Sequence, residues 1–240
     1  MASVRVPGFV PSVNGLAYPN SWPSNPIRSF RLGNVATLSI GDAANGLCGG
    51  MSFTVADLHR AGLLPPKEPS PPPASNAQYR YIVDRQITSF DEGKLPLRFY
   101  SLMSPTRPAK ETMWAPWLGR VGVDRHSRTY VMAHEEWPAI RRILDGGQLA
   151  MVGLVRVVSL DPQMLGHNHQ VLAYGYDLTG SVVNLRICDP NWPKDDSVTI
   201  TLDTANPMGS AGPTWSKPDS QLLCFFHYPF APVDPAPFRQ

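Results

Sequence analysis

The spacing of apolar and polar positions changes once along the chain, near residue 149. Before it, apolar residues recur at helical spacing, which predicts helices at 46–60, 76–90, 95–103 and 135–144, with Gly62 where the first would stop. After it, short β-branched and aromatic runs between turn residues predict strands at 149–159, 169–177, 181–189, 197–203 and 221–228. Helices first and strands afterwards is an α+β order, not the alternation of a parallel α/β sheet.

This pattern predicts one domain over residues 1–240. Residues 1–40 show little periodicity and many prolines, so we expect an arm wrapped on the surface. Residues 41–148 form a mainly helical half, which contains a proline-rich loop at 65–73. Residues 149–240 form a mainly β half.

Composition and charge exclude several functions. Lys and Arg number 21 against 19 Asp and Glu, so no strong field favours nucleic acid or an anionic membrane. No apolar run approaches the length of a membrane span, and residues 1–7 lack the apolar stretch of a secretory signal. The three cysteines lack CxxC spacing. Dinucleotide and phosphate-loop motifs are absent. We therefore expect a cytoplasmic protein with reduced thiols, no cofactor and no nucleic-acid or membrane partner; nothing specifies a protein partner.

Cys48 stands between Leu47 and two glycines at the start of the first predicted helix. Backbone N–H groups and the positive end of the helix dipole at such a position stabilise a thiolate over a thiol. The alternative is a small buried apolar residue beside a turn.

A base and an orienting acid for that thiol are predicted from the β half. His169 opens one predicted strand and Asp189 closes the next, with a turn at Thr179-Gly180 between them. Strands joined in this way are antiparallel neighbours, so the start of the first meets the end of the second. A thiolate nucleophile needs a nearby base, and the base needs a third group to fix its ring. The sequence thus predicts a Cys48–His169–Asp189 triad.

These segments resemble the papain-like cysteine peptidase superfamily. The matching pieces are Gly46-Leu-Cys-Gly-Gly50 at a helix start, Asn168-His169 followed by Gly175-Tyr176, and Asp-Pro-Asn-Trp at 189–192. The Asp-Pro strand end looks more like the bacterial bacteriocin-processing branch. The chain is also similar to a set of bacterial papain-like proteins that share Gly-Leu-Cys-Gly-Gly-Met and Asn-His-Gln-Val-Leu-Ala-Tyr-Gly-Tyr-Asp.

This resemblance implies a helical half led by the Cys48 helix, packed on an antiparallel β half, with the active cleft between them. It also implies a cysteine peptidase or amidase. The Cys48 thiolate would attack a peptide or other amide or acyl substrate and form a thioester, without a metal; water would then hydrolyse the thioester or an amine would take the acyl group. The alternative is a non-catalytic binding or structural module that retains the fold, since a fold does not fix a function.

One position departs from the family pattern. Papain relatives carry a Gln six residues before the nucleophile, and its amide helps to bind the oxyanion. Here that residue is Asp42, whose carboxylate would repel the developing charge. Asn45 is the candidate that would supply the amide instead.

Three further possibilities surround the predicted triad. Asn191 is a secondary candidate for the third member, but Pro190 redirects the chain and favours Asp189. Trp192, beside Asp189, would shield the His–Asp hydrogen bond from water. A metal site made by His167 and His169 with Cys188 and Asp189 is the competing interpretation, because residues two apart on a strand share a face; we expect no metal.

Overall fold

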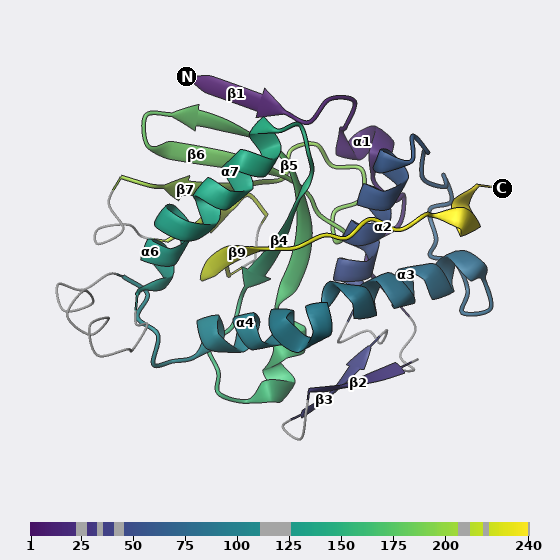
Figure 1. The fold of residues 1–240 in the computed structure, drawn as a ribbon, viewed down its shortest axis with the longest axis horizontal. Coiled ribbons are helices and arrows are strands. Elements are labelled where there is room, and N and C mark those ends of the chain that lie inside the picture. The colour runs from purple at the N-terminus through teal and green to yellow at the C-terminus, as the bar shows by residue number, and fades with distance from the viewer. Residues whose placement is uncertain are drawn as a thin grey trace.

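Helices occupy much of the first part of the chain and strands most of the second, as the change of period predicts (Figure 1). The computed structural model describes residues 1–22, 28–32, 36–40, 46–110, 126–205, 212–217 and 221–239. The α-helices are α1 (Pro11–Asn14), α2 (Cys48–Arg60), α3 (Ala77–Ser89), α4 (Lys94–Met103), α6 (Arg128–Val131) and α7 (Trp137–Asp145). The strands are β1 (Ala2–Arg5), β2 (Arg28–Leu32), β3 (Ala36–Ile40), β4 (Ala150–Val155), β5 (His169–Thr179), β6 (Val182–Cys188), β7 (Thr199–Asp203), β8 (Thr214–Trp215) and β9 (Cys224–Tyr228).

The C-terminal strands form a curled antiparallel sheet in the order β8-β7-β6-β5-β4-β9, and β1 pairs with β5 outside that path. Strand β5 begins opposite the end of β4, where His169 pairs with Leu154. On its other side, Leu172 pairs with Cys188, the last residue of β6. This register brings the start of β5 beside the residue that follows β6, as the hairpin argument predicts. The two-stranded pair β2–β3, which the apolar pattern missed, lies apart from this sheet.

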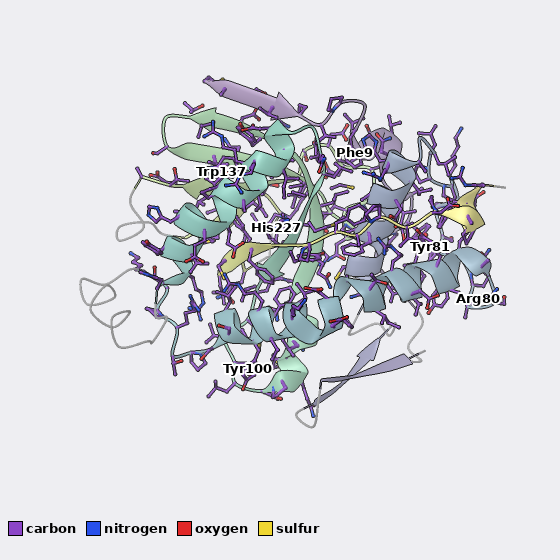
Figure 2. All side chains as sticks on the ribbon, in the orientation of Figure 1. Phe9, Arg80, Tyr81, Tyr100, Trp137 and His227 are labelled. Carbon is purple, nitrogen blue, oxygen red and sulfur yellow. The ribbon has the colours of Figure 1, made fainter. Side chains whose placement is uncertain are left out.

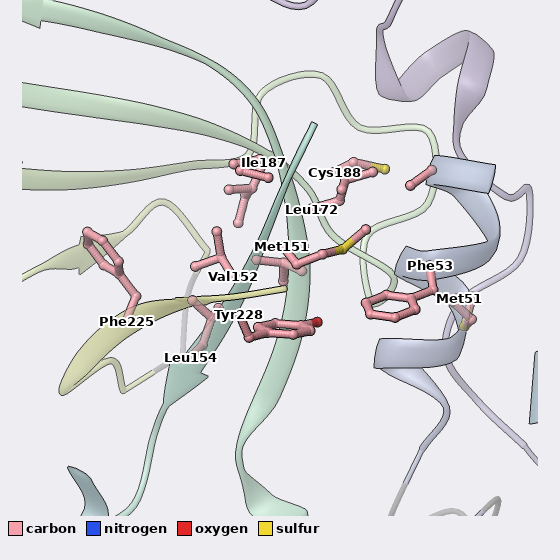
Figure 3. Close-up of a cluster of buried hydrophobic side chains, with 14 of the residues drawn as sticks. Met51, Phe53, Met151, Val152, Leu154, Leu172, Ile187, Cys188, Phe225 and Tyr228 are labelled. Carbon is pink, nitrogen blue, oxygen red and sulfur yellow. The ribbon is translucent and has the colours of Figure 1, made fainter. Parts of the chain in front are cut away.

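Helix α2 lies between β5 and α3 and is buried from Cys48 to Leu58. Figure 3 shows Phe53 of this helix facing Tyr228 of β9, and their rings stack with centroids 5.9 Å apart. On the other side α3 comes so close that a Cβ at Gly50 would lie 2.1 Å from the backbone oxygen of Ile82. Burial on both sides therefore fixes the first turn of α2, which carries Cys48.

The expectation of a surface arm at residues 1–40 is wrong for residues 1–22. Strand β1 extends the sheet, and five apolar side chains of residues 1–22 are buried: Val6, Phe9, Leu16, Tyr18 and Trp22. Phe9, labelled in Figure 2, has its ring centroid 5.6 Å from Tyr174 of the sheet and 5.2 Å from His59 of α2. Prolines and glycines interrupt these apolar positions, so the segment packs without a periodic pattern.

The remaining helices complete the fold around the sheet. Helix α7 contacts β1, β4, β5 and β9, and its Trp137 (Figure 2) packs edge-on against Tyr176 of β5 with ring centroids 5.0 Å apart. Helix α4 packs on the sheet through Phe99, which meets Phe226 of β9. Within the described ranges, no helix combines the length and apolar character needed to cross a bilayer.

Candidate functional site

Cys48 is the first residue of α2, and 9% of its surface is exposed. The first N–H groups of a helix have no partner within the helix, and their dipoles favour a negative charge beside them. Gln86 of α3 accepts one of these, the N–H of Gly50, at 2.8 Å. The Cys48 and Gly49 N–H groups precede it, so the thiol lies at the positive end of a firmly packed helix.

His169 and Asp189 make the contact that their positions on neighbouring strands predict. His169 Nε2 lies 2.7 Å from Asp189 Oδ1, and the side chains are 3% and 0% exposed. On its other side the His169 ring is close enough to Cys48 for the sulfur to affect the pKa of the imidazole. Because Nε2 faces the carboxylate, Nδ1 is the ring nitrogen available to the sulfur. The ring therefore links the thiol to the acid.

The electrostatics of this group favour a protonated imidazole. Burial lowers the pKa of His169, but the charges of Asp189 and of a Cys48 thiolate, with the hydrogen bonds to both, raise it to about 10. At neutral pH His169 is then an imidazolium that lies between the Asp189 carboxylate and the Cys48 sulfur. A cation beside a cysteine is the kind of environment in which reactive thiols are found.

The two other thiols have the opposite environment. Burial raises the pKa of Cys188 to about 12, and the neighbouring Asp189 charge adds to the effect. Burial likewise raises the pKa of Cys224, which is 1% exposed, to about 12. Both are reduced, unpaired thiols in the structure, as the sequence predicts. They are core residues, and among the described residues a histidine base lies beside Cys48 but not beside these two.

Asp189 is the acid that meets His169, and Asn191 is not. The Asn191 side chain is exposed, and only its backbone N–H reaches the site, where it donates to Asp189 Oδ1 at 2.9 Å. Asp189 Oδ2 is buried and has no hydrogen-bond partner among the described residues. The carboxylate is therefore hydrogen-bonded through one oxygen, which meets both the His169 ring and the Asn191 N–H.

The aromatic ring against His169 is Trp215 of β8, not Trp192 as the sequence analysis expected. The Trp215 and His169 rings stack at 24° with centroids 5.9 Å apart, and the Arg156 guanidinium covers Trp215 at 5.7 Å. Trp192 is 37% exposed and its ring carries the Lys217 ammonium at 4.7 Å. Sequence proximity to Asp189 favoured Trp192, whereas β8 reaches the site through pairing with β7, which the sequence pattern did not reveal.

Asn20 is a second residue that the sequence analysis missed. Its Oδ1 accepts the N–H of Leu47 at 2.8 Å and the Nε1–H of Trp22 at 2.9 Å. Its backbone N–H donates to the carbonyl of Pro190 at 2.9 Å. Asn20 thus connects the residue before Cys48 to the residue after Asp189, and nothing in the sequence around it indicated this.

The remaining predictions at the site concern the oxyanion donor and a competing metal site. Asp42 and Asn45 lie outside the described residues. His167 ends a short 3₁₀ turn, Pro162–His167, and is exposed, whereas His169 is buried. Within the part of the chain that the structure describes, no three His, Cys, Asp or Glu side chains come together to hold a metal ion.

The site brings together a thiol, an imidazole and a carboxylate from three places in the fold: the start of α2, the start of β5 and the residue that follows β6. Such a group can transfer an acyl group through a thioester. Comparisons with protein-family models, curated proteins and solved structures found no match to this chain. The chemistry of the site is therefore the basis for the function that follows.

Proposed function

We propose that the protein is a papain-like thiol acyl hydrolase, a cysteine peptidase or amidase, with Cys48 as nucleophile, His169 as base and acid, and Asp189 as the residue that orients His169. The observation that carries this proposal is the chain of contacts Cys48–His169–Asp189, with the His–Asp bond at 2.7 Å and buried. A buried, hydrogen-bonded imidazolium beside a thiol at a helix start is costly to build for structure alone. It is useful where a thiolate must be kept at neutral pH.

The reaction begins with attack of the Cys48 thiolate on the carbonyl carbon of an amide or ester. The tetrahedral oxyanion collapses, the bond to the leaving group breaks, and the His169 imidazolium gives its proton to the departing amine. This leaves a thioester on Cys48 and a neutral His169. Neutral His169 then takes a proton from water, whose oxygen attacks the thioester. The acid leaves, and the thiolate–imidazolium pair is restored.

Asp189 and Trp215 support this cycle without touching the substrate. The Asp189 carboxylate holds Nε2–H, which keeps Nδ1 directed at the sulfur. Trp215 covers one face of the imidazole, and Arg156 covers Trp215. Exclusion of water by these stacked groups strengthens the hydrogen bond between His169 and Asp189, since charge–dipole interactions are stronger in a low dielectric.

Acetylation by p-nitrophenyl acetate tests the proposal with a small activated ester. We expect release of p-nitrophenolate, one acetyl group on Cys48 by mass spectrometry, and its loss by hydrolysis on standing. Cys48→Ala should give no acetylated protein, and Cys188→Ala should match the wild type. If Cys48 in the folded wild type takes up no acetyl group, the protein is not an acyl hydrolase, and a binding or structural module with this fold becomes the better account.

A further inference from the structure

The hydrogen bonds of Asn20 determine which way its amide faces. An Asn side chain carries one acceptor oxygen and one –NH₂ donor. Leu47 N–H and Trp22 Nε1–H both donate to the same atom, so that atom is the oxygen and the other is the donor nitrogen. The Asn20 amide therefore brings an N–H donor next to the chain that leads into Cys48, with its oxygen already occupied.

The surroundings of Gly46 show how close the Asn20 amide lies to the backbone that leads into Cys48. A Cβ at Gly46 would lie 2.3 Å from Asn20 Nδ2 and 2.5 Å from its Oδ1, distances that side-chain carbons do not reach. The amide thus lies flat on the backbone two residues before Cys48. Its other anchor is the Pro190 carbonyl beside Asp189. Asn20 is held from both sides of the site, although it lies 28 residues before Cys48 in the sequence.

The proposed reaction needs hydrogen-bond donors near the start of α2. Addition of the thiolate to a carbonyl places a negative charge on the former carbonyl oxygen, close to the start of α2. The Cys48 N–H, free of any intrahelical acceptor, is one donor for that oxygen. A second donor on the same side of the sulfur would complete an oxyanion hole. Among the described residues, the Gln86 amide donates its N–H to Ser89, and Gln170 turns its amide oxygen toward Gly49. The Asn20 amide, in contrast, has its oxygen occupied and its N–H donor against the backbone that leads into Cys48.

We infer that Asn20 Nδ2 is the side-chain donor of the oxyanion hole, in the place for which the sequence analysis considered Asn45. This inference rests on the proposed function. The N-terminal segment then supplies a catalytic group as well as core side chains. Gly46 is required at its position because a larger residue would displace the amide.

Two reactions of the same thiol separate this role from a structural one. Acetylation by p-nitrophenyl acetate passes through a tetrahedral oxyanion, whereas alkylation by iodoacetamide displaces iodide at a saturated carbon and forms none. The ratio of the two rate constants at one pH therefore reports the oxyanion hole and cancels changes in thiolate content. Asn20→Asp keeps the oxygen that accepts from Leu47 and Trp22 but replaces the donor with a repelling oxygen.

We expect Asn20→Asp to lower the acetylation-to-alkylation ratio by about 10²–10³-fold, the usual cost of one lost oxyanion donor. Gly46→Ala should lower the same ratio by displacing the amide. Asn191→Asp adds the same charge near Asp189 and should leave the ratio within about twofold. Asn45→Asp should also leave it unchanged.

Three results would overturn the inference in distinguishable ways. An unchanged ratio in Asn20→Asp, or equal loss of both reactions, would make Asn20 a structural brace alone. A lowered ratio in Asn45→Asp with a normal Asn20→Asp would make Asn45 the donor. Absence of acetylation in the wild type would remove the proposed function itself, and the inference with it.

Discussion

Helix α2 carries two buried acid–base arrangements, one at each end, and they differ in a way that separates structure from reactivity. Near its C-terminal end, Asp57 pairs with Arg85 of α3 at 2.7 Å, with side chains 0% and 2% exposed. Near its start, Cys48 contacts the pair formed by His169 and Asp189. Both arrangements are equally hidden from solvent.

The hydrogen bonds of the two carboxylates are unequal. Asp57 Oδ2 accepts from Arg85 and Tyr81, and its Oδ1 accepts from the backbone N–H of Val233. Arg85 also donates to the carbonyl of Ala231, so this pair fastens the C-terminal segment to α2 and α3. Asp189 has one oxygen without a partner among the described residues, and its cationic partner can lose its proton. A carboxylate bonded through both oxygens and paired with a permanent charge holds the fold. A carboxylate bonded through one oxygen and paired with a titratable charge can take part in chemistry.

The largest loss of stability should come from substitution of Asp57, near the C-terminal end of α2. Asp57→Ala leaves the Arg85 guanidinium buried without its carboxylate, and we expect the free energy of unfolding in urea to fall by about 3–5 kcal/mol. The folded fraction should keep the wild-type rate of Cys48 acetylation. As a control, Asp57→Leu with Arg85→Met replaces both charges and should recover most of the loss. Reduced Cys48 reactivity in that folded double variant would show that the two ends of α2 are not separate.

Substitution of Asp189, the acid at the other end of α2, should reduce the reactivity of Cys48 more than the stability of the fold. Asp189→Ala should slow Cys48 acetylation by about 10²-fold, because His169 loses both its orientation and the charge that keeps it protonated. The stability loss should be smaller than for Asp57→Ala, since a neutral His169 can stay buried. Asn191→Ala, whose exposed side chain is two residues away, should react at close to the wild-type rate. If Asn191→Ala were the more damaging change, the assignment of the third member would be wrong.

The charge of His169 should be measurable through a smaller effect, the preference of Cys48 for an anionic over a neutral alkylating reagent. Iodoacetate is an anion and iodoacetamide is neutral, so an imidazolium next to the sulfur should favour iodoacetate by roughly tenfold or less. The proton stays on His169 below its pKa and leaves as the pH rises through about 10. The ratio of the two alkylation rates at Cys48 should therefore be high at neutral pH and fall through about pH 10. A ratio that is flat from pH 6 to 11 would mean that no titrating cation faces the thiol.

The sequence predicts most of the elements of the fold and the His169–Asp189 contact, but not every residue at the site. The apolar period placed α2, α3, α4 and most of the main sheet, because regular burial leaves a regular pattern. The hairpin between β5 and β6 then brought His169 to Asp189, because one short turn fixes their register. The sequence did not show β1 in the sheet, nor Trp215 and Asn20 at the site, since each arrives through long-range packing of irregular segments. The Asp57–Arg85 pair was also missed, for a different reason: charged residues in a helix are usually expected to be exposed.

The central claim is that His169 keeps Cys48 as a reactive thiolate, and alkylation by iodoacetamide across pH 5–9 tests it most directly. Mass spectrometry of the folded protein follows Cys48, Cys188 and Cys224 separately, and Cys48→Ala is the blank. We expect Cys48 to label rapidly in the folded protein, and Cys188 and Cys224 to label only after unfolding. His169→Gln should slow Cys48 at about pH 6 by roughly 10²-fold. Labelling of Cys48 no faster than of Cys188 and Cys224, or unchanged in His169→Gln, would contradict the claim.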